Sequence, residues 1–303
     1  PPGSIPTLNP ASTYLAQGNA LLAQQLIVDG IAADTAAAQA YIASRTPEQT
    51  AAYLRSKTPA SLLLTLLTRL APLGLAGSGP IPEGTVLPVD PIASISAGEY
   101  LRVPVLAGNT RDEAKLFPTF LGLLGGPSGR LVTDAQLFSI QFNYDPDAAP
   151  QIAIEQWIPA FYLPVTTPGT GFNARTDLLN AIFFIPSRNN MLDTLLTQQP
   201  DVWYFQFDWD EEPAPFDDIY GAAHAFDLSF VFGNFGPSLF SNIANSSANR
   251  QGRLELSDAM MRSLGAFART GDPNTPALGV GWPTWPSTLL FDATPDHKAI
   301  AVQ

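Results

Sequence analysis

The chain of 303 residues contains no cysteine and only two histidines, His224 and His297. The absence of cysteine excludes a disulfide framework, a thiolate metal site and a cysteine nucleophile. With two histidines, a zinc site would need several carboxylate ligands, and no spacing of acidic residues suggests one. The sequence therefore predicts no metal and no other cofactor, and it makes His224 a candidate for proton transfer near neutral pH.

Positive charge is scarce, because Lys57, Lys115 and Lys298 are the only lysines and the formal net charge is -12. Such a chain repels phosphate backbones and anionic lipid, so we predict no nucleic-acid partner and a neutral or cationic small-molecule substrate. The low lysine content also indicates an exported bacterial protein, either secreted or periplasmic.

Long apolar runs are absent as well. The nearest, residues 61–75, is interrupted by polar residues and a proline, so it falls short of the roughly 20 apolar residues of a membrane span. Residues 1–6 resemble neither an initiator start nor a signal peptide, which predicts that the true N-terminus lies elsewhere. Hydrophobic residues at 46% and charged residues at 14% predict one globular domain with a large core.

Helix and strand signals alternate along the chain. Residues 1–75 are rich in alanine and leucine and carry a capping box at 46–49, which predicts several short helices. Apolar, β-branched runs predict strands at 100–108, 202–208, 289–292 and 298–302. A capping box at 133–136 and helical spacing before Gly271 predict helices between them. The expected fold is therefore α/β, with a mostly parallel sheet flanked by helices.

Two candidate catalytic side chains follow two of these strands. Glu113 comes shortly after the predicted strand, whose apolar run ends at Leu106, and His224 comes after the strand that ends near 208 and an acidic, proline-bearing loop. The loops at the carboxyl ends of parallel strands form the sites of such sheets. If both strands are parallel, these two side chains lie at the same edge.

Four segments, in this order, resemble the type B carboxylesterase and cholinesterase family. They are VPVLAGNTRDE (103–113), GAAHAFDLSFVFG (221–233), FARTGDPN (267–274) and WP (282–283). Shorter matches at 87–90 and 175–177 extend the resemblance over nearly the whole chain from about residue 76. The family's fold is the α/β hydrolase, and its reaction is ester hydrolysis through an acylated serine.

The resemblance assigns roles to particular positions. The family's triad acid matches Glu113 and its base matches His224, with Asp112 as the alternative acid. Asp227 matches a position where relatives carry a glutamate that supports the histidine, although capping its own loop is the simpler role. The chain departs from the family at Ala225 and Ala114, which replace small glycines, and these changes are tolerable unless the backbone needs a positive φ there.

The third member of the triad is missing from this sequence. No Gly-x-Ser-x-Gly nucleophile elbow occurs in it. Ser78 lies between two glycines, but a proline follows and no strand precedes it, so we interpret it as a turn residue. We therefore expect residues 1–303 to be the C-terminal part of a single α/β-hydrolase domain, with a helical segment at 1–75 and the remaining sheet and helices at 76–303. A separate N-terminal chain would supply the serine and the oxyanion hole.

Aromatic residues between the two candidate loops suggest a substrate pocket. In relatives this region lines the gorge and the acyl pocket, whereas most aromatic side chains belong to the core. The candidates for pocket lining are Phe117, Phe120, Trp157, Phe161 and Tyr162. His297, near the C-terminus, is interpreted as a hairpin-loop residue.

The sequence thus predicts a carboxylic ester hydrolase that is active only with its N-terminal half. Two alternatives stay open. One is a non-catalytic, cholinesterase-like binding or adhesion module, which would have no chemical reason to carry both Glu113 and His224. The other is an inert fragment with an unpaired sheet edge, which would aggregate.

Overall fold

The computed structural model describes residues 10–75 and 79–303, so Ser78 lies outside the described part. The chain divides into two compact units. The helical unit ends at Ser94, and the sheet unit begins at Ile95 and continues to Gln303.

The helical unit consists of several helices, as predicted, although α1, with 18 residues, is not short. Thr46 and Gln49 form the expected capping box, and the Asp34 side chain accepts a hydrogen bond at the start of the second helix. Leu22, Leu26 and Ala38 form a small buried cluster between the helices. The elements are α1 (Ala11–Val28), α2 (Thr35–Ala43), α3 (Pro47–Arg55), α4 (Pro59–Thr65), the π-helical η1 (Leu66–Leu70), the 3-10 helix η2 (Ala71–Leu73) and α5 (Pro91–Ser96), which crosses into the sheet unit.

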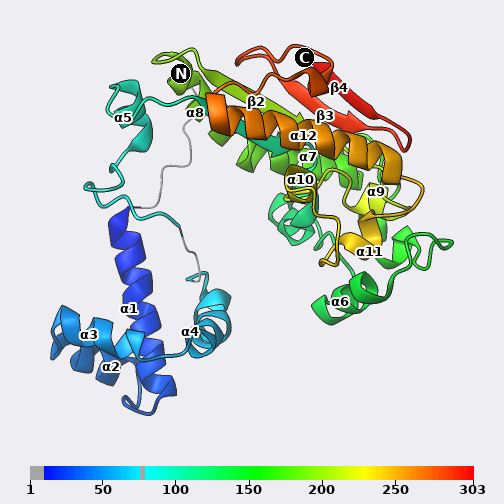
Figure 1. The fold of residues 1–303 in the computed structure, drawn as a ribbon. Coiled ribbons are helices and arrows are strands. Elements are labelled where there is room, and N and C mark those ends of the chain that lie inside the picture. Colours follow the sequence, from blue (N-terminus) through cyan, green and yellow to red (C-terminus); the bar gives the residue numbers. More distant parts are fainter. Residues whose placement is uncertain (1–9, 76–78) are drawn as a thin grey trace. The chain divides into compact units, whose positions relative to one another are not determined.

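Four strands in the order β1-β2-β3-β4 form the sheet (Figure 1). The pairs β1–β2 and β2–β3 are parallel, and β3–β4 is an antiparallel hairpin, so the prediction of a mostly parallel sheet is confirmed. The first strand begins five residues later than the sequence suggested, because Pro104 has no N–H to give to a ladder. The strands are β1 (Val105–Thr110), β2 (Val202–Phe207), β3 (Leu289–Ala293) and β4 (Lys298–Val302).

Helices cover both faces of this sheet. Alternate side chains of β2 point to opposite faces. Tyr204 packs in a cluster with Leu192 and Leu195 of α8 (Ile185–Leu196), whereas the Trp203 ring lies 6.0 Å from Phe267 of α12 (Arg250–Thr270). The sheet is therefore buried between α8 on one side and α12 on the other, as expected for parallel strands.

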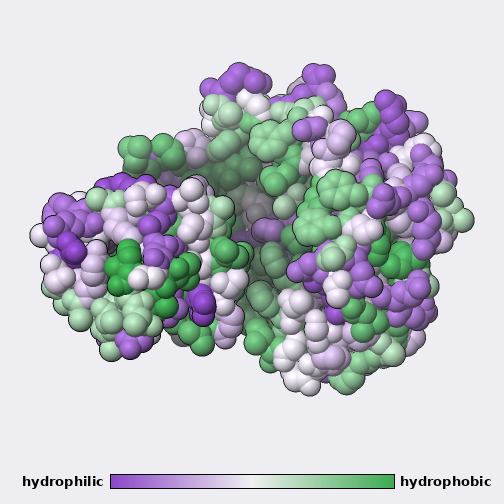
Figure 2. Space-filling model, turned by 90° about the horizontal axis from the view of Figure 1, so that it is seen from below, coloured by the Kyte–Doolittle hydropathy of each residue, from purple (hydrophilic) through white to green (hydrophobic). Residues whose placement is uncertain are grey.

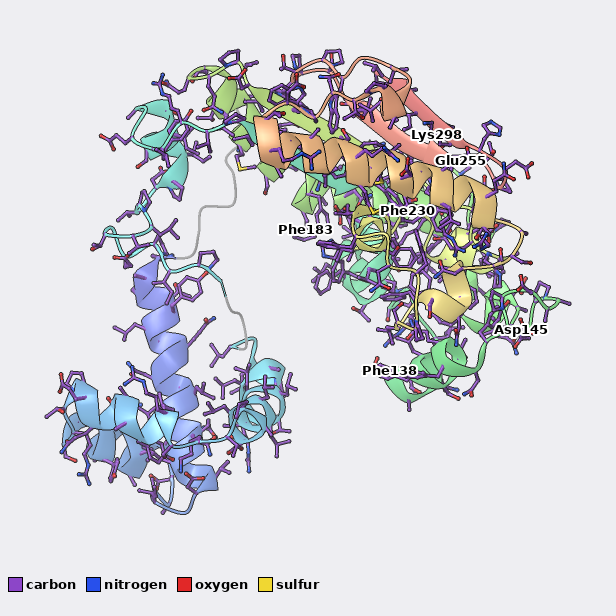
Figure 3. All side chains as sticks on the ribbon, viewed as in Figure 1. Phe138, Asp145, Phe183, Phe230, Glu255 and Lys298 are labelled. Atoms are coloured by element: carbon purple, nitrogen blue, oxygen red, sulfur yellow. The ribbon has the colours of Figure 1, made fainter. Side chains whose placement is uncertain are left out.

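The helix α12 runs along the sheet and ends at Gly271, which has a φ of 78°. The predicted helix and its C-terminal glycine are thus confirmed. Near the other end of α12, a Glu255 carboxylate oxygen accepts a hydrogen bond from the backbone N–H of Lys298 at 3.3 Å, which joins the helix to β4 (Figure 3).

Short helices and 3-10 turns fill the connections between the strands. The predicted capping box of Thr133 and Gln136 is present at the start of α6. The remaining elements are η3 (Glu113–Leu116), η4 (Pro118–Leu124), α6 (Asp134–Asn143), η5 (Ile154–Gln156), η6 (Ala160–Tyr162), α7 (Phe172–Phe183), α9 (Phe216–Ile219), α10 (Asp227–Val231), α11 (Ser241–Ala244) and η7 (Pro276–Leu278).

Apolar side chains are exposed among the polar ones on the surface of the sheet unit (Figure 2). Phe142 and Phe232 are examples, with 68% and 72% of their surface exposed. Within residues 10–75 and 79–303, no helix combines the length and the apolar character that crossing a bilayer requires.

Candidate active site

The acid side of the site follows directly from β1. This strand can lie close to β2 because position 108 is glycine, where a Cβ atom would come within 2.2 Å of the Phe205 ring. The chain then turns into η3, which begins at Glu113. Glu113 is only 5% exposed, and its Oε1 atom accepts two hydrogen bonds at 3.0 Å, from Asn109 Nδ2 and from the backbone N–H of Thr110.

The base side is the loop between α9 and α10. Asp112 and Ala223 form an isolated parallel bridge, with the backbone N–H of Asp112 donating to the carbonyl of Ala222 at 2.9 Å. The base loop is therefore attached to the acid loop one residue before His224. As a result, two segments far apart in the sequence lie side by side.

The two candidate side chains meet at this bridge. His224 Nδ1 lies 2.5 Å from Glu113 Oε2, within hydrogen-bonding distance. The imidazole side chain is 47% exposed whereas the carboxylate side chain is 7% exposed. Within the described residues no group bonds to the second ring nitrogen, Nε2. A neutral imidazole held through an Nδ1–H leaves Nε2 as an acceptor, which is the form a general base needs.

Asp112, the alternative acid, does not contact His224 but binds three other groups. Its carboxylate lies 2.9 Å from Arg111 Nη2 and 3.5 Å from Lys115 Nζ, and it accepts a hydrogen bond from the backbone N–H of Ala222 at 3.2 Å. Lys115 is 5% exposed, so this ion pair is buried. Asp112 thus fastens the base loop, while Glu113 contacts the imidazole.

Arg111 adds a second carboxylate to this cluster, since its Nη2 lies 2.7 Å from Asp210 Oδ2. Burial alone would lower the pKa of Arg111, but the charges of Asp112 and Asp210 outweigh it and raise that pKa. The guanidinium is therefore a permanent positive charge between the two carboxylates.

Asp227 stands at the start of α10, three residues after His224. Burial raises its pKa, the nearby Glu113 charge raises it further, and its own backbone N–H lowers it. A protonated His224 would lower this pKa as well. In the described part of the chain, Asp227 bonds to neither member of the pair. This position fits both roles considered for it, which are supporting the histidine and capping its own loop.

Aromatic rings lie next to the His224 imidazole. The Phe117 ring centroid lies 5.3 Å from that of His224, and the Phe184 centroid lies 6.3 Å from it. Phe120 stacks on Phe117 at 5.9 Å, and it is followed by Phe183, at the end of α7, at 6.5 Å (Figure 3). The structure therefore brings Phe117 and Phe120 to the site, together with two phenylalanines that sequence reasoning did not single out.

A family model described as the carboxylesterase family matches residues 16–298, almost the whole chain. The chain belongs to the carboxylesterase family. Para-nitrobenzyl esterase of Bacillus subtilis is 26% identical over 219 residues, which cover 71% of this chain and 39% of that enzyme. An acetylcholinesterase of Leptinotarsa decemlineata is 24% identical over 242 residues, which cover 71% of this chain and 34% of that protein.

A solved structure of this family, the carboxylesterase EST55 of Geobacillus stearothermophilus, matches with a TM-score of 0.57 and 22% identity. The match covers 96% of this chain and 53% of that one. This carboxylesterase-family chain thus has the α/β-hydrolase fold and spans about half the length of that relative.

The other three aromatic candidates lie away from the imidazole. Trp157 and Tyr162 are each 1% exposed and therefore cannot line an open pocket. Trp157 packs edge-on against Phe216 at 5.7 Å, and the Tyr162 hydroxyl donates to the Pro127 carbonyl at 2.6 Å. Phe161 is exposed, and its ring contacts Tyr162 at 5.0 Å. Burial thus sets Trp157 and Tyr162 apart from Phe120, whereas Phe161 is as exposed as Phe120.

Asn180 of α7 is a site residue that sequence reasoning missed. Its Oδ1 accepts from the backbone N–H of Ala114 at 2.8 Å, and its Nδ2 donates to the Arg111 carbonyl at 2.9 Å. It thereby holds the loop that carries Glu113. The available signal was an asparagine among apolar neighbours within a helix, since such a side chain is buried only when it is hydrogen-bonded.

His297 lies in the turn between β3 and β4, as predicted, and its Nδ1 is 3.0 Å from Thr294 Oγ1. Among the described residues, no group of three or more histidine and acidic side chains is placed to hold a metal ion.

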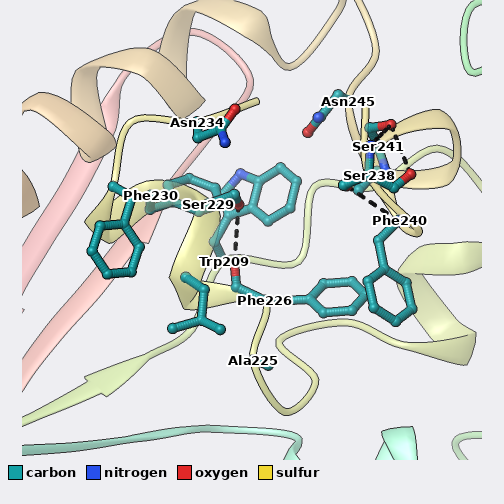
Figure 4. Close-up of a pocket in the computed structure, with 13 residues that line it drawn as sticks. Trp209, Ala225, Phe226, Ser229, Phe230, Asn234, Ser238, Phe240, Ser241 and Asn245 are labelled. Carbon is teal, nitrogen blue, oxygen red and sulfur yellow. Dashed lines mark hydrogen bonds between the residues drawn. The ribbon is translucent and has the colours of Figure 1, made fainter. Parts of the chain in front are cut away.

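A cavity of about 370 Å³ begins beside the base loop (Figure 4). Its wall combines aromatic, serine and asparagine side chains and runs from Ala225 and Phe226 through α10 to α11. Trp209 and Phe240 close its sides, and the Ser229 hydroxyl donates to the Phe226 carbonyl at 3.2 Å. This cavity borders Ala225 and Phe226, the two residues after His224, and none of the aromatic candidates lines it.

Ala225, immediately after His224, has a φ of 68° and is the one non-glycine residue with a positive φ in the described ranges. The replacement of a glycine by Ala225 was expected to matter only if the backbone has a positive φ there, and it does. A Cβ atom makes this left-handed region unfavourable by roughly 1–2 kcal/mol. We expect Ala225→Gly to raise the free energy of unfolding by about 1 kcal/mol, since glycine adopts this φ without strain. Urea unfolding of the chain measures this.

The matched control is Ala268→Gly in α12, at an exposed position with no positive φ. There glycine should lower the free energy of unfolding by about 1 kcal/mol. Opposite signs at the two positions support backbone strain at Ala225, and equal losses would contradict it.

Proposed function

We propose that this chain is the acid- and base-bearing part of a serine carboxylic ester hydrolase. The observation that carries the proposal is the 2.5 Å contact between His224 Nδ1 and Glu113 Oε2, which presents Nε2 of a half-exposed imidazole. A base oriented by a buried carboxylate is the arrangement that activates a hydroxyl nucleophile.

In the proposed reaction, His224 Nε2 takes the proton of a serine hydroxyl as that oxygen attacks the ester carbonyl. The tetrahedral intermediate then collapses, the C–O bond to the alcohol breaks, and the imidazolium gives its proton to the departing alkoxide. Water repeats the sequence on the acyl-serine, with His224 again as the base, and releases the acid. Glu113 keeps the ring in the Nδ1–H tautomer and stabilises the imidazolium that forms in each step.

The nucleophile and the oxyanion hole are assigned to an N-terminal half of the same esterase. Two observations support this division: the chain contains no Gly-x-Ser-x-Gly elbow, and it matches 39% of the Bacillus enzyme and 53% of EST55. The elbow lies before the acid and the base in the chain order of α/β hydrolases. An upstream half would therefore carry it.

The surroundings of His224 favour an ester with an apolar group. Phe117, Phe120, Phe183 and Phe184 present aromatic rings beside the imidazole. Rings of this kind bind an acyl or aryl group through burial of apolar surface. The net charge of -12 favours neutral or cationic esters over anionic ones.

The alternative of a binding module without catalysis explains less. Such a module does not require a buried carboxylate within 2.5 Å of an exposed imidazole. Burying Glu113 without that partner and its other donors would be costly, and a binding module could replace the pair with apolar residues.

The test uses this chain and its N-terminal half, produced separately and then mixed. We expect p-nitrophenyl acetate hydrolysis, and labelling by a serine-directed fluorophosphonate, only in the mixture, with the label on the N-terminal half. Hydrolysis by the chain alone would contradict the division of the triad. A folded mixture that neither hydrolyses esters nor takes up the label would contradict the esterase function itself.

A further inference from the structure

A chain of hydrogen bonds leads from α8 to the Glu113 carboxylate. Arg188 Nη1 lies 3.0 Å from the Tyr204 hydroxyl, which lies 3.5 Å from Asn109 Oδ1, and Asn109 Nδ2 lies 3.0 Å from Glu113 Oε1. The second carboxylate oxygen, Oε2, is the one that meets His224. Asn109 and His224 therefore bond to different oxygens of the same Glu113 carboxylate.

The direction of each bond in this chain is fixed by chemistry. Arginine can only donate, so the Tyr204 oxygen must accept from Arg188 and its one proton is free for another acceptor. That acceptor is Asn109 Oδ1, because the amide nitrogen cannot take a proton. The amide is thus oriented with its NH₂ group towards Glu113, and this group can only donate, so the carboxylate oxygen accepts.

The sheet explains why these residues meet. Ala107 pairs with Tyr204 in the parallel register of β1 and β2, and Asn109 follows two residues later on the same face of β1. This is the face covered by α8, which brings Arg188 over the Tyr204 ring at 4.9 Å and over Trp285 at 5.7 Å. Burial raises the pKa of Tyr204, which keeps its hydroxyl protonated and able to donate.

A polar cavity of about 210 Å³ borders the same residues, including Asn109, Glu113, Arg188 and Tyr204. Without the Asn109 amide as a fixed donor, the Glu113 side chain could rotate into this cavity and away from His224. The hydrogen bond from the backbone N–H of Thr110 to Oε1 would, by itself, hold that oxygen in place but still let the rest of the Glu113 carboxylate rotate about it.

We propose that Asn109, oriented by Tyr204 and Arg188, is a positioning residue that directs the second oxygen of Glu113 to His224. This proposal rests on the esterase function proposed above, because it concerns how the acid holds the base. Asn109 acts through Glu113 and does not touch a substrate. Its removal should therefore change the state of the His224 ring more than it changes the stability of the fold.

The test is nuclear magnetic resonance of the 303-residue chain with ¹⁵N-labelled histidine. The chain has two imidazoles, and His297→Ala assigns their signals. We expect His224 to show the Nδ1–H tautomer and a downfield Nδ1 proton bonded to Glu113. Asn109→Leu should abolish the downfield proton and mix the tautomers, and Tyr204→Phe should weaken the same signal.

The matched control is Tyr144→Phe. Tyr144 is a buried tyrosine whose hydroxyl donates to the Ala214 carbonyl at 3.2 Å, away from this chain of bonds. Its removal should leave the His224 signals unchanged. Wild-type His224 signals in both Asn109→Leu and Tyr204→Phe would overturn the proposal, as would an equal loss in Tyr144→Phe. If Asn109→Leu fails to fold, Tyr204→Phe decides alone.

These signals do not depend on hydrolysis, so a failure of this proposal is distinguishable from a failure of the esterase function. In the mixture of both halves, Asn109→Leu should lower kcat by roughly tenfold to hundredfold with little change in KM, because it misplaces the base without removing a substrate contact.

Discussion

Replacing His224 with alanine is expected to lower kcat for ester hydrolysis by roughly 10⁴- to 10⁶-fold in the mixture of this chain with the proposed N-terminal half. The imidazole is the group that would take the serine proton and later protonate the alcohol, and Glu113 cannot replace it, because its Oε1 is held by Asn109 and Thr110. Steady-state kinetics with p-nitrophenyl acetate measures the loss. Rates for slow variants need correction for spontaneous hydrolysis.

His297→Ala is the internal control, because it removes the only other imidazole of the chain. His297 bonds to Thr294 in the β3–β4 turn, so its loss should leave kcat within about twofold of wild type. An equal loss in both variants would mean that folding, and not proton transfer, limits the activity. A His224→Ala enzyme with wild-type kcat would remove His224 from the mechanism.

The second large effect concerns Asp112. Asp112→Asn should lower the free energy of unfolding by about 3–5 kcal/mol, because it leaves the buried ammonium of Lys115 without its counter-charge. It also weakens the bond to the Ala222 N–H that fastens the base loop. Urea or thermal unfolding of the chain measures the loss, and a fall of the thermal midpoint by roughly 10 °C is expected.

Asp210→Asn is the matched control. Asp210 binds the same Arg111 at 2.7 Å, but its side chain is 42% exposed and Arg111 is 37% exposed. An ion pair exposed to this extent contributes at most about 1 kcal/mol. If the two variants lose similar stability, burial of the Asp112 cluster is not what makes it important.

The strands and the long helix were predictable because their signals are local. Apolar runs at 202–207 and 289–293, and helical spacing that ends at Gly271, depend on neighbours within a few residues. The positions of Glu113 and His224 followed from family motifs and from the rule that parallel strands end at one edge. The sequence alone could only suggest that these two side chains meet, whereas the structure gives the 2.5 Å contact between them.

The supporting residues were less predictable, because their roles depend on distant partners. Asn109 and Asn180 are ordinary polar residues until the register of β1 on β2 and the packing of α7 bring them to Glu113 and its loop. Trp157 and Tyr162 were predicted to line the pocket but are buried. Nothing in their spacing along the sequence distinguishes them from the exposed Phe120. The strain at Ala225 likewise depends on a backbone angle that the residue type disfavours.

The bridge between Asp112 and Ala223 has a kinetic consequence for joining the two halves. The bridge aligns Glu113 and His224 within a single polypeptide. The conformational freedom of these two side chains is therefore lost when this chain folds, before it meets another polypeptide. The proposed N-terminal half would then have to deliver the serine hydroxyl and the oxyanion hole to an acid–base pair that is already in place. The onset of hydrolysis after mixing should accordingly follow second-order association, without a subsequent lag.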